Sequence, residues 1–211
     1  MSKIFTPSQA DEIVAVGLKK IAILEPDVPQ SKIDAFAVHL RKAAEYAAAI
    51  CRQIPALDEK IGYVFGCLHD YGKFFGDVYG KRSFHGYVGY VEMLKLSQPE
   101  IARICLTHTF FCENFNIDDY KYYRPDLIAA HNILKNVQFN DYDRLMQLVD
   151  LLAGVGDKGR GINARIAGIA ERYGLNADFA ARLLQSTLDK KAYFDNKCGT
   201  DILDLLGKKY D

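Results

Sequence analysis

Apolar residues recur at intervals of three and four along most of this chain, which is the spacing of a buried helix face. The segment 31–50 shows the pattern most clearly. Its apolar positions are Ile33, Phe36, Ala37, Leu40, Ala43, Ala44, Ala47 and Ile50. No stretch shows the sustained period-two alternation of a half-buried strand. The sequence therefore predicts an all-α fold.

Prolines, glycines and capping residues divide this pattern into helices. Thr6, Pro7 and Gln9 form a capping signature at the start of the first helix, and the Pro-containing segment 25–29 separates it from a second helix that opens at Ser31. A third helix is expected from about Leu57 to Asp70, and the glycine-rich segment 71–82 is expected to be a loop. Further helices are expected at about 84–96, 99–108, 125–135, 141–153, 160–173, 177–190 and 200–208.

The totals are those of an ordinary globular protein. The 211 residues are 49% hydrophobic and 26% charged, enough to bury one core, so residues 1–211 are expected to form a single domain. Lys+Arg and Asp+Glu both number 27, and this balance disfavours nucleic acid or an anionic membrane as a partner. The sequence shows neither a signal peptide nor a window of about 20 apolar residues that could span a bilayer. The five cysteines form no CxxC pair, so we expect reduced thiols and a cytoplasmic location.

Two polar residues, His69 and Asp70, end a predicted helix whose last turns are apolar throughout, from Val64 to Leu68. Burying such groups without partners would cost several kcal/mol, on the order of 2–7 kcal/mol for a polar group. Histidine is scarce, with five in the chain, and His39 also lies at the edge of a predicted apolar stripe. Imidazoles and carboxylates that converge on one point are the ligands of a metal ion.

The ordered series His39, then His69-Asp70, then Asp150 in a later predicted helix resembles the H…HD…D signature of HD-domain phosphohydrolases. The segment Cys67–Lys73 matches the family's form, an apolar residue followed by H-D-x-G-K. Phe84–Tyr90 is similar to the H-x-x-x-G segment of the subgroup with extra histidines, and Ile104–His108 to the helix end that carries the next one. The motif core spans about residues 35–155. Residues 156–211 are expected to form a helical extension, in which 165–174 resembles small stand-alone members.

The resemblance implies an HD-domain-like helical bundle and a metal-dependent phosphohydrolase that uses a metal-activated water. One ion would be held by His39, His69, Asp70 and Asp150. A second would be held by His85 and His108, with Asp70 bridging the two. The ions would be divalent transition metals (Fe, Mn, Ni, Co or Zn). Some two-metal relatives carry consecutive histidines where Thr109 follows His108 here, so the number of ions stays open at this point.

Lys73 lies three residues beyond Asp70, where the family match gives it a catalytic role beside Asp70, facing the substrate phosphate. The substrate is expected to be a small phosphorylated compound, with nucleotides among the candidates. His131 lies outside the matched segments and is interpreted as structural. The glycine-rich segment 154–161 lacks the order of a phosphate-binding loop and is interpreted as a connection, with Lys158 or Arg160 as a weaker substrate contact. The aromatic segment 110–123 is expected either to line the entrance or to pack under a loop.

Three other functions use the same ligands. A mixed-valence di-iron oxygenase of the myo-inositol oxygenase type shares the six-ligand pattern and the lysine. A nuclease resembling the HD domain of CRISPR helicase-nucleases is less compatible with the neutral charge balance and the lack of a fused helicase. A non-catalytic regulator that binds nucleotide or metal is the third. The sequence does not separate these alternatives, nor does it give the oligomeric state.

Overall fold

The computed structural model describes residues 4–78, 83–109, 125–154 and 161–208, apart from the side chains of 172 and 173. Over these residues the fold is all-α, as the periodicity predicts. The α-helices are α1 (Pro7–Leu24), α2 (Gln30–Gln53), α3 (Glu59–Leu68), α4 (His85–Lys95), α5 (Pro99–Thr107), α6 (Pro125–Leu134), α7 (Asp141–Ala153), α8 (Ile162–Tyr173), α9 (Ala177–Cys198) and α10 (Ile202–Leu205). None of the helices in this described part is long and apolar enough to cross a membrane.

Local sequence signals account for most helix boundaries. Thr6 caps α1 through a capping box with Gln9, and Pro7 occupies the first helical position, as predicted. Asn140 caps α7 in the same way, with Asp143 as its partner. Helix α3 is shorter than predicted. It runs from Glu59 to Leu68, and His69 is its C-cap residue.

Three predictions about element length were wrong. The segment 71–82, expected to be a loop, begins with a 3-10 helix, η1 (Tyr71–Phe75), because Phe74 is buried in a cluster with Ile21 and Leu40. Helix α9 continues past residue 190 to Cys198, because the fully buried Phe194 gives its last turns a core face. Helix α10 covers only four residues of the segment 200–208.

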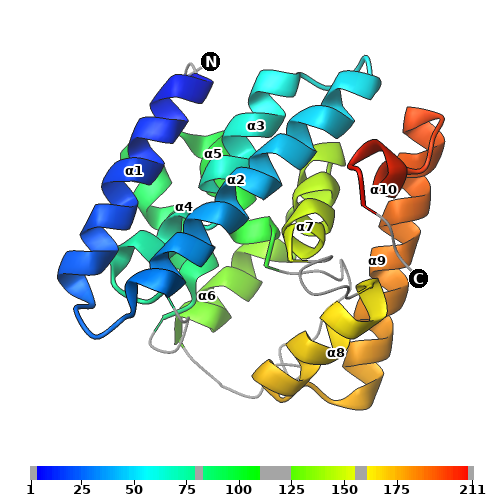
Figure 1. The fold of residues 1–211 in the computed structure, drawn as a ribbon. Coiled ribbons are helices and arrows are strands. Elements are labelled where there is room, and N and C mark those ends of the chain that lie inside the picture. The colour runs from blue at the N-terminus through cyan, green and yellow to red at the C-terminus, as the bar shows by residue number, and fades with distance from the viewer. Residues whose placement is uncertain (1–3, 79–82, 110–124, 155–160, 209–211) are drawn as a thin grey trace.

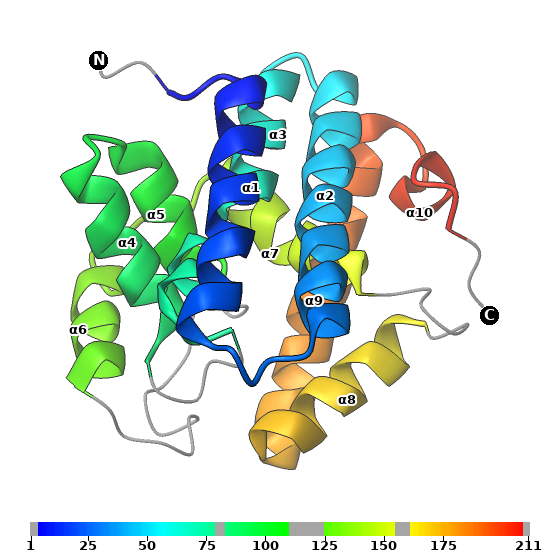
Figure 2. The ribbon, with the colours of Figure 1, turned by 60° about the vertical axis from the view of Figure 1, so that its left-hand side comes forward.

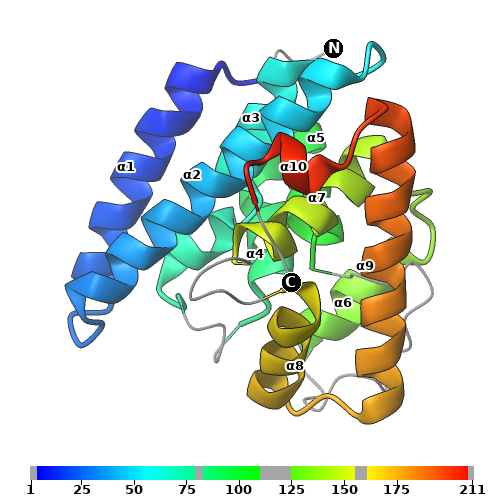
Figure 3. The same cartoon turned by 45° about the vertical axis from the view of Figure 1, so that its right-hand side comes forward.

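In the view of Figure 1, α1 lies at the left edge and α9 and α10 lie at the right. Figure 2 shows three groups of helices: α1, α2, α3 and α7 occupy the middle, α4, α5 and α6 lie on one side, and α8, α9 and α10 lie toward the other. Figure 3 shows α10 between α2 and α9. One buried cluster links the middle group to both flanks and includes Ala44 of α2, Cys105 of α5 and Phe194 of α9.

Helices α2 and α3 pack with their backbones in close approach. A β-carbon on Gly66 would lie 2.4 Å from the Cα of Ala44, so any side chain at this position would push the two helices apart. The small residues Ala43 and Ala47 are fully buried on the same face of α2. This contact fixes the separation between His39 on α2 and His69 at the end of α3.

Gly66→Ala is therefore expected to lower the free energy of unfolding by roughly 1–3 kcal/mol, the cost of overpacking a tight core. Gly168→Ala is the matched control, because a β-carbon there meets nothing within 4 Å. That change should stabilise the protein by up to about 1 kcal/mol through helix propensity. Urea unfolding followed by circular dichroism measures both, and equal effects of the two substitutions would contradict the close packing.

Candidate metal centre

Six side chains with metal-binding atoms converge where five segments meet. They form overlapping groups whose donor atoms all lie within 4.8 Å of one another. They are His39 of α2, His69 and Asp70 between α3 and η1, His85 of α4, His108 after α5, and Asp150 of α7. The structure thus brings together every residue that the sequence predicted as a ligand.

The first group consists of His39, His69, Asp70 and Asp150. The Nε2 atom of His39 lies 3.3 Å from that of His69, 3.1 Å from Oδ1 of Asp150 and 3.7 Å from Oδ2 of Asp70. His69 Nε2 lies 3.6 Å from the same Asp70 oxygen and 3.7 Å from Asp150 Oδ1. Ligands that share one ion at bond lengths near 2.1 Å lie about 3.0–3.6 Å apart. Three of these five distances lie in that range and the other two, at 3.7 Å, are just above it.

The second group uses the other oxygen of Asp70. Oδ1 lies 3.1 Å from His85 Nε2 and 3.3 Å from His108 Nε2, and the two Nε2 atoms are 3.3 Å apart. Asp70 therefore presents Oδ2 to one group of histidines and Oδ1 to the other. If each group held an ion, Asp70 would bridge the two ions through its two oxygens. The donor set is nitrogen and oxygen only, which suits divalent transition metals.

Helix ends orient two of the imidazoles. His69 and His108 are the C-cap residues of α3 and α5, and each places Nδ1 against a backbone carbonyl of its own helix, Gly66 at 2.8 Å and Ile104 at 3.1 Å. Because a carbonyl oxygen can only accept, Nδ1 carries a proton, so whenever the ring is neutral its lone pair is on Nε2, which faces the cluster. Backbone carbonyls in the last turns of the two helices thus fix the tautomer required of a ligand.

Glycines allow the second group to form. A β-carbon on Gly72 would lie 1.9 Å from the carbonyl oxygen of His85, so η1 and the start of α4 touch through bare backbone. A β-carbon on Gly86 would lie 2.8 Å from the carbonyl oxygen of Cys105 on α5, and one on Gly89 would lie 2.9 Å from Cβ of the same cysteine. These three glycines bring His85 and His108 up to Asp70. The sequence shows the glycines, but only the fold shows which backbones they bring together.

The centre has a buried floor and an accessible rim. His69, Asp70 and His108 are at most 2% exposed, whereas His39, Lys73, His85 and Asp150 are 17–21% exposed. An ion held on the floor could therefore be reached from the side of these four residues.

Electrostatics keep the carboxylates ionised. Burial would raise the pKa of Asp70, but the Lys73 ammonium and then His69 hold that pKa well below its usual range. Burial also opposes ionisation of Asp150, and hydrogen bonds with His39 and His69 again hold its pKa well below normal. Both aspartates are therefore available as charged ligands at neutral pH.

The histidines differ in how readily they take up a proton. Burial and the nearby Lys73 lower the pKa of His85 to about 4, so its ring is neutral at neutral pH. Burial works against protonation of His69 too, but the Asp70 and Asp150 carboxylates outweigh it and raise its pKa. Metal binding to the first group must displace this proton, and its affinity should fall as the pH drops below that raised pKa.

Lys73 points at the Asp70 carboxylate. Its Nζ lies 2.6 Å from Oδ2 of Asp70 and 5.3 Å from the centre of the Phe36 ring. The 3-10 turn of η1 carries it there, because its backbone NH donates to the Asp70 carbonyl at 2.9 Å. The sequence placed this lysine in a loop facing the site, and the structure places it in a short helix beside Asp70.

A polar clamp between α5 and α7 holds the segment that carries His108. Gln147 Nε2 donates to the Thr107 carbonyl at 3.0 Å, and the Thr107 hydroxyl donates to Asp143 at 2.8 Å. Asp143 is fully buried and also pairs with Arg103. Sequence reasoning missed this clamp, although Asp143 and Gln147 share one face of α7 at a spacing of four.

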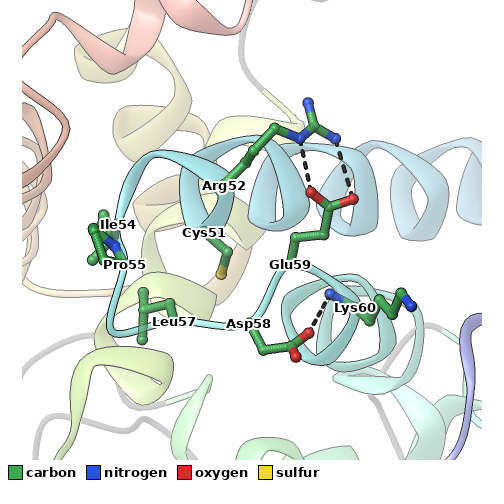
Figure 4. Close-up of a pocket in the computed structure, with 8 residues that line it drawn as sticks. All are labelled: Cys51, Arg52, Ile54, Pro55, Leu57, Asp58, Glu59 and Lys60. Carbon is green, nitrogen blue, oxygen red and sulfur yellow. Dashed lines mark hydrogen bonds and ion pairs between the residues drawn. The ribbon is translucent and has the colours of Figure 1, made fainter.

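The other predicted features lie elsewhere. His131 is on α6 and belongs to none of the metal-binding groups. The aromatic segment 110–123 lies outside the described residues, as do Lys158 and Arg160. A surface pocket at the turn between α2 and α3 is lined by Cys51, the Arg52–Glu59 ion pair and Asp58 (Figure 4). It is at the opposite end of α3 from His69, and burial raises the pKa of the Cys51 thiol to about 12.

Comparisons of this chain with protein-family models, curated proteins and solved structures found no match.

The bridging position of Asp70 makes a prediction about metal stoichiometry. Asp70→Asn should retain neither ion, because both groups lose their shared charged ligand, whereas His108→Ala should retain one of two. Elemental analysis after dialysis against Mn²⁺-containing and then metal-free buffer measures the content. His131→Ala is the matched control and should bind as the parent does. Two ions retained by Asp70→Asn would contradict the bridging role.

The clamp predicts an effect at one site only. Gln147→Leu should weaken the second ion about 10–100-fold, the usual effect of removing a group that orients a ligand, while the first ion binds as before. Mn²⁺ titration with a two-site analysis resolves this, and Gln53→Leu on the exposed end of α2 is the control. Equal weakening of both ions would show that Gln147 contributes only to general packing.

Proposed function

We propose that this protein is a metal-dependent phosphohydrolase of the HD superfamily that cleaves a small phosphomonoester or phosphodiester. The observation that carries the proposal is the Asp70 carboxylate, which offers one oxygen to each of two histidine groups in a buried floor. The ordered motif His39, His69-Asp70, His85, His108 and Asp150 supports the family assignment.

Divalent ions held by these groups would lower the pKa of a water toward neutrality and polarise phosphoryl oxygens. The protein's part is to hold its ligands still. His69 and His108 are locked by bonds to backbone carbonyls, and Asp70 is fixed between them. Such preorganisation avoids rearrangement of the site during the reaction. The site would need no side-chain nucleophile, since the attacking group would be the water.

Lys73 is proposed to bind the phosphoryl group. It is 21% exposed and on the rim, so its ammonium can face both Asp70 and a ligand above it. A cation in this position would offset charge that develops on the phosphoryl oxygens. A small phosphorylated metabolite, a nucleotide included, fits this role better than nucleic acid, because the chain has no net positive charge.

Orthophosphate release tests the proposal. Metal-free protein is reloaded separately with Mn²⁺, Fe²⁺, Co²⁺, Ni²⁺ or Zn²⁺ and incubated without oxygen with p-nitrophenyl phosphate, bis(p-nitrophenyl) phosphate and a panel of nucleotides. We expect metal-dependent hydrolysis. Oxygen consumption with a polyol by the iron form, without phosphate release, would favour an oxygenase that uses the same ligands. Cleavage of single-stranded DNA would favour a nuclease, and tight nucleotide binding without turnover a regulator.

Lys73→Ala should lower kcat/KM for p-nitrophenyl phosphate about 10²–10³-fold, the usual effect of removing one group that stabilises transition-state charge. Its metal content should be unchanged, because Lys73 is not a ligand. Lys60→Ala, on the exposed first turn of α3, removes the same charge and should leave the rate unchanged. Steady-state kinetics and elemental analysis on the same samples separate the two effects. A Lys73→Ala variant with parental kcat/KM would refute the role of this lysine.

A further inference from the structure

The guanidinium of Arg165, on α8, packs directly against the backbone at the end of α7. A β-carbon on Gly154 would lie 2.6 Å from Cζ of Arg165, 2.7 Å from Nε and 2.8 Å from an outer nitrogen. The backbone of Gly154 has a φ of −94°, which any residue can adopt. The glycine is therefore needed for space, and the space is filled by the arginine.

The Nε atom of Arg165 is a buried hydrogen-bond donor that has no partner among the described residues. If the guanidinium only capped the C-terminal end of α7, it would donate hydrogen bonds to the last carbonyl groups of that helix. The planar guanidinium fork matches an oxyanion through paired hydrogen bonds. A buried, unpaired donor of this kind points to a ligand.

The arginine lies close to the metal centre along α7. Gly154 and Asp150 are four residues apart, which puts them on one face of the helix about 6 Å apart along its axis. Asp150 is on the rim of the centre, with Oδ1 3.1 Å from His39 Nε2. The guanidinium thus lies about one helical turn beyond a predicted metal ligand, on the same face of α7.

We propose that Arg165 binds a second oxyanion of the substrate, one helical turn from the phosphate at the metal centre. The substrate class is then a compound with two anionic groups, either a bisphosphate or a phosphate ester that also carries a carboxylate. This inference rests on the proposed function for the position of the first phosphate. It adds what that function leaves open, the chemical feature by which the substrate is selected.

Phosphonates that cannot be hydrolysed test the proposal by binding alone. The full chain loaded with Mn²⁺ is titrated by calorimetry with methylphosphonate, propane-1,3-diphosphonate and 3-phosphonopropionate. We expect the diphosphonate, the phosphonocarboxylate or both to bind about tenfold more tightly than methylphosphonate, and the tighter of the two identifies the second anion.

Substitutions test whether the tighter binding of two-anion ligands depends on Arg165. Arg165→Met should abolish the tenfold gain and leave the Kd for methylphosphonate and the metal content within twofold of the parent. Gly154→Ala should reduce the gain as well, because its β-carbon displaces the guanidinium. Arg182→Met removes the same charge from an exposed position of α9 and should retain the gain.

Two results would overturn the proposal: the same affinity of the parent protein for one-anion and two-anion ligands, or a full gain in Arg165→Met. Neither depends on turnover. Suppose that the gain in affinity for two-anion ligands disappears in Arg165→Met while the parent protein leaves p-nitrophenyl phosphate intact. That pair of results would support the anion site and contradict the proposed hydrolase function.

Discussion

The arrangement of the centre depends on one buried charge, the carboxylate of Asp70. An ionised carboxylate that is 1% exposed is stable only if cations and hydrogen-bond donors surround it. Lys73 supplies the nearest cation, at 2.6 Å, and imidazoles from α3, α4 and α5 lie 3.1–3.6 Å from the carboxylate oxygens, with a fourth from α2 at 3.7 Å. An ion held by the same nitrogens would supply further positive charge. Helices α3 and α5 therefore end, and helix α4 begins, around this group. The glycines that let their backbones touch are part of the same requirement.

The sequence predicts the parts of this arrangement that depend on local chemistry. Helical periodicity and capping residues gave the helices, since both signals reside in neighbouring residues. His69 and Asp70 were recognisable because polar groups at the end of an apolar helix need partners. The other ligands were identified by order and resemblance, and the structure brings them within ligand distance of one another.

The parts that the sequence did not predict depend on contacts between distant segments. Gly72 is an ordinary loop glycine in the sequence, and its role appears only when the carbonyl of His85 is found against it. The bond from Gln147 to Thr107 joins residues 40 apart. The sequence assigns no individual role to Arg165 within the segment 165–174, because its packing against Gly154 depends on how α7 and α8 are placed relative to each other. The 3-10 helix η1 was missed because burial of Phe74 by α1 and α2 overrides the loop preference of its glycine-rich segment.

The division between floor and rim gives these residues different functions. His69, Asp70 and His108 are enclosed and held by backbone carbonyls or by one another, so a substitution there alters both packing and metal binding. Lys73 and Asp150 on the rim have an accessible side chain and a fixed base, which suits contact with a ligand. Arg165 extends the rim along α7 beyond Asp150. The metal ligands do not set the distance between the two anionic groups of the substrate. If residues outside the metal groups select the substrate, a metal centre with the same ligands would therefore be able to act on different anions.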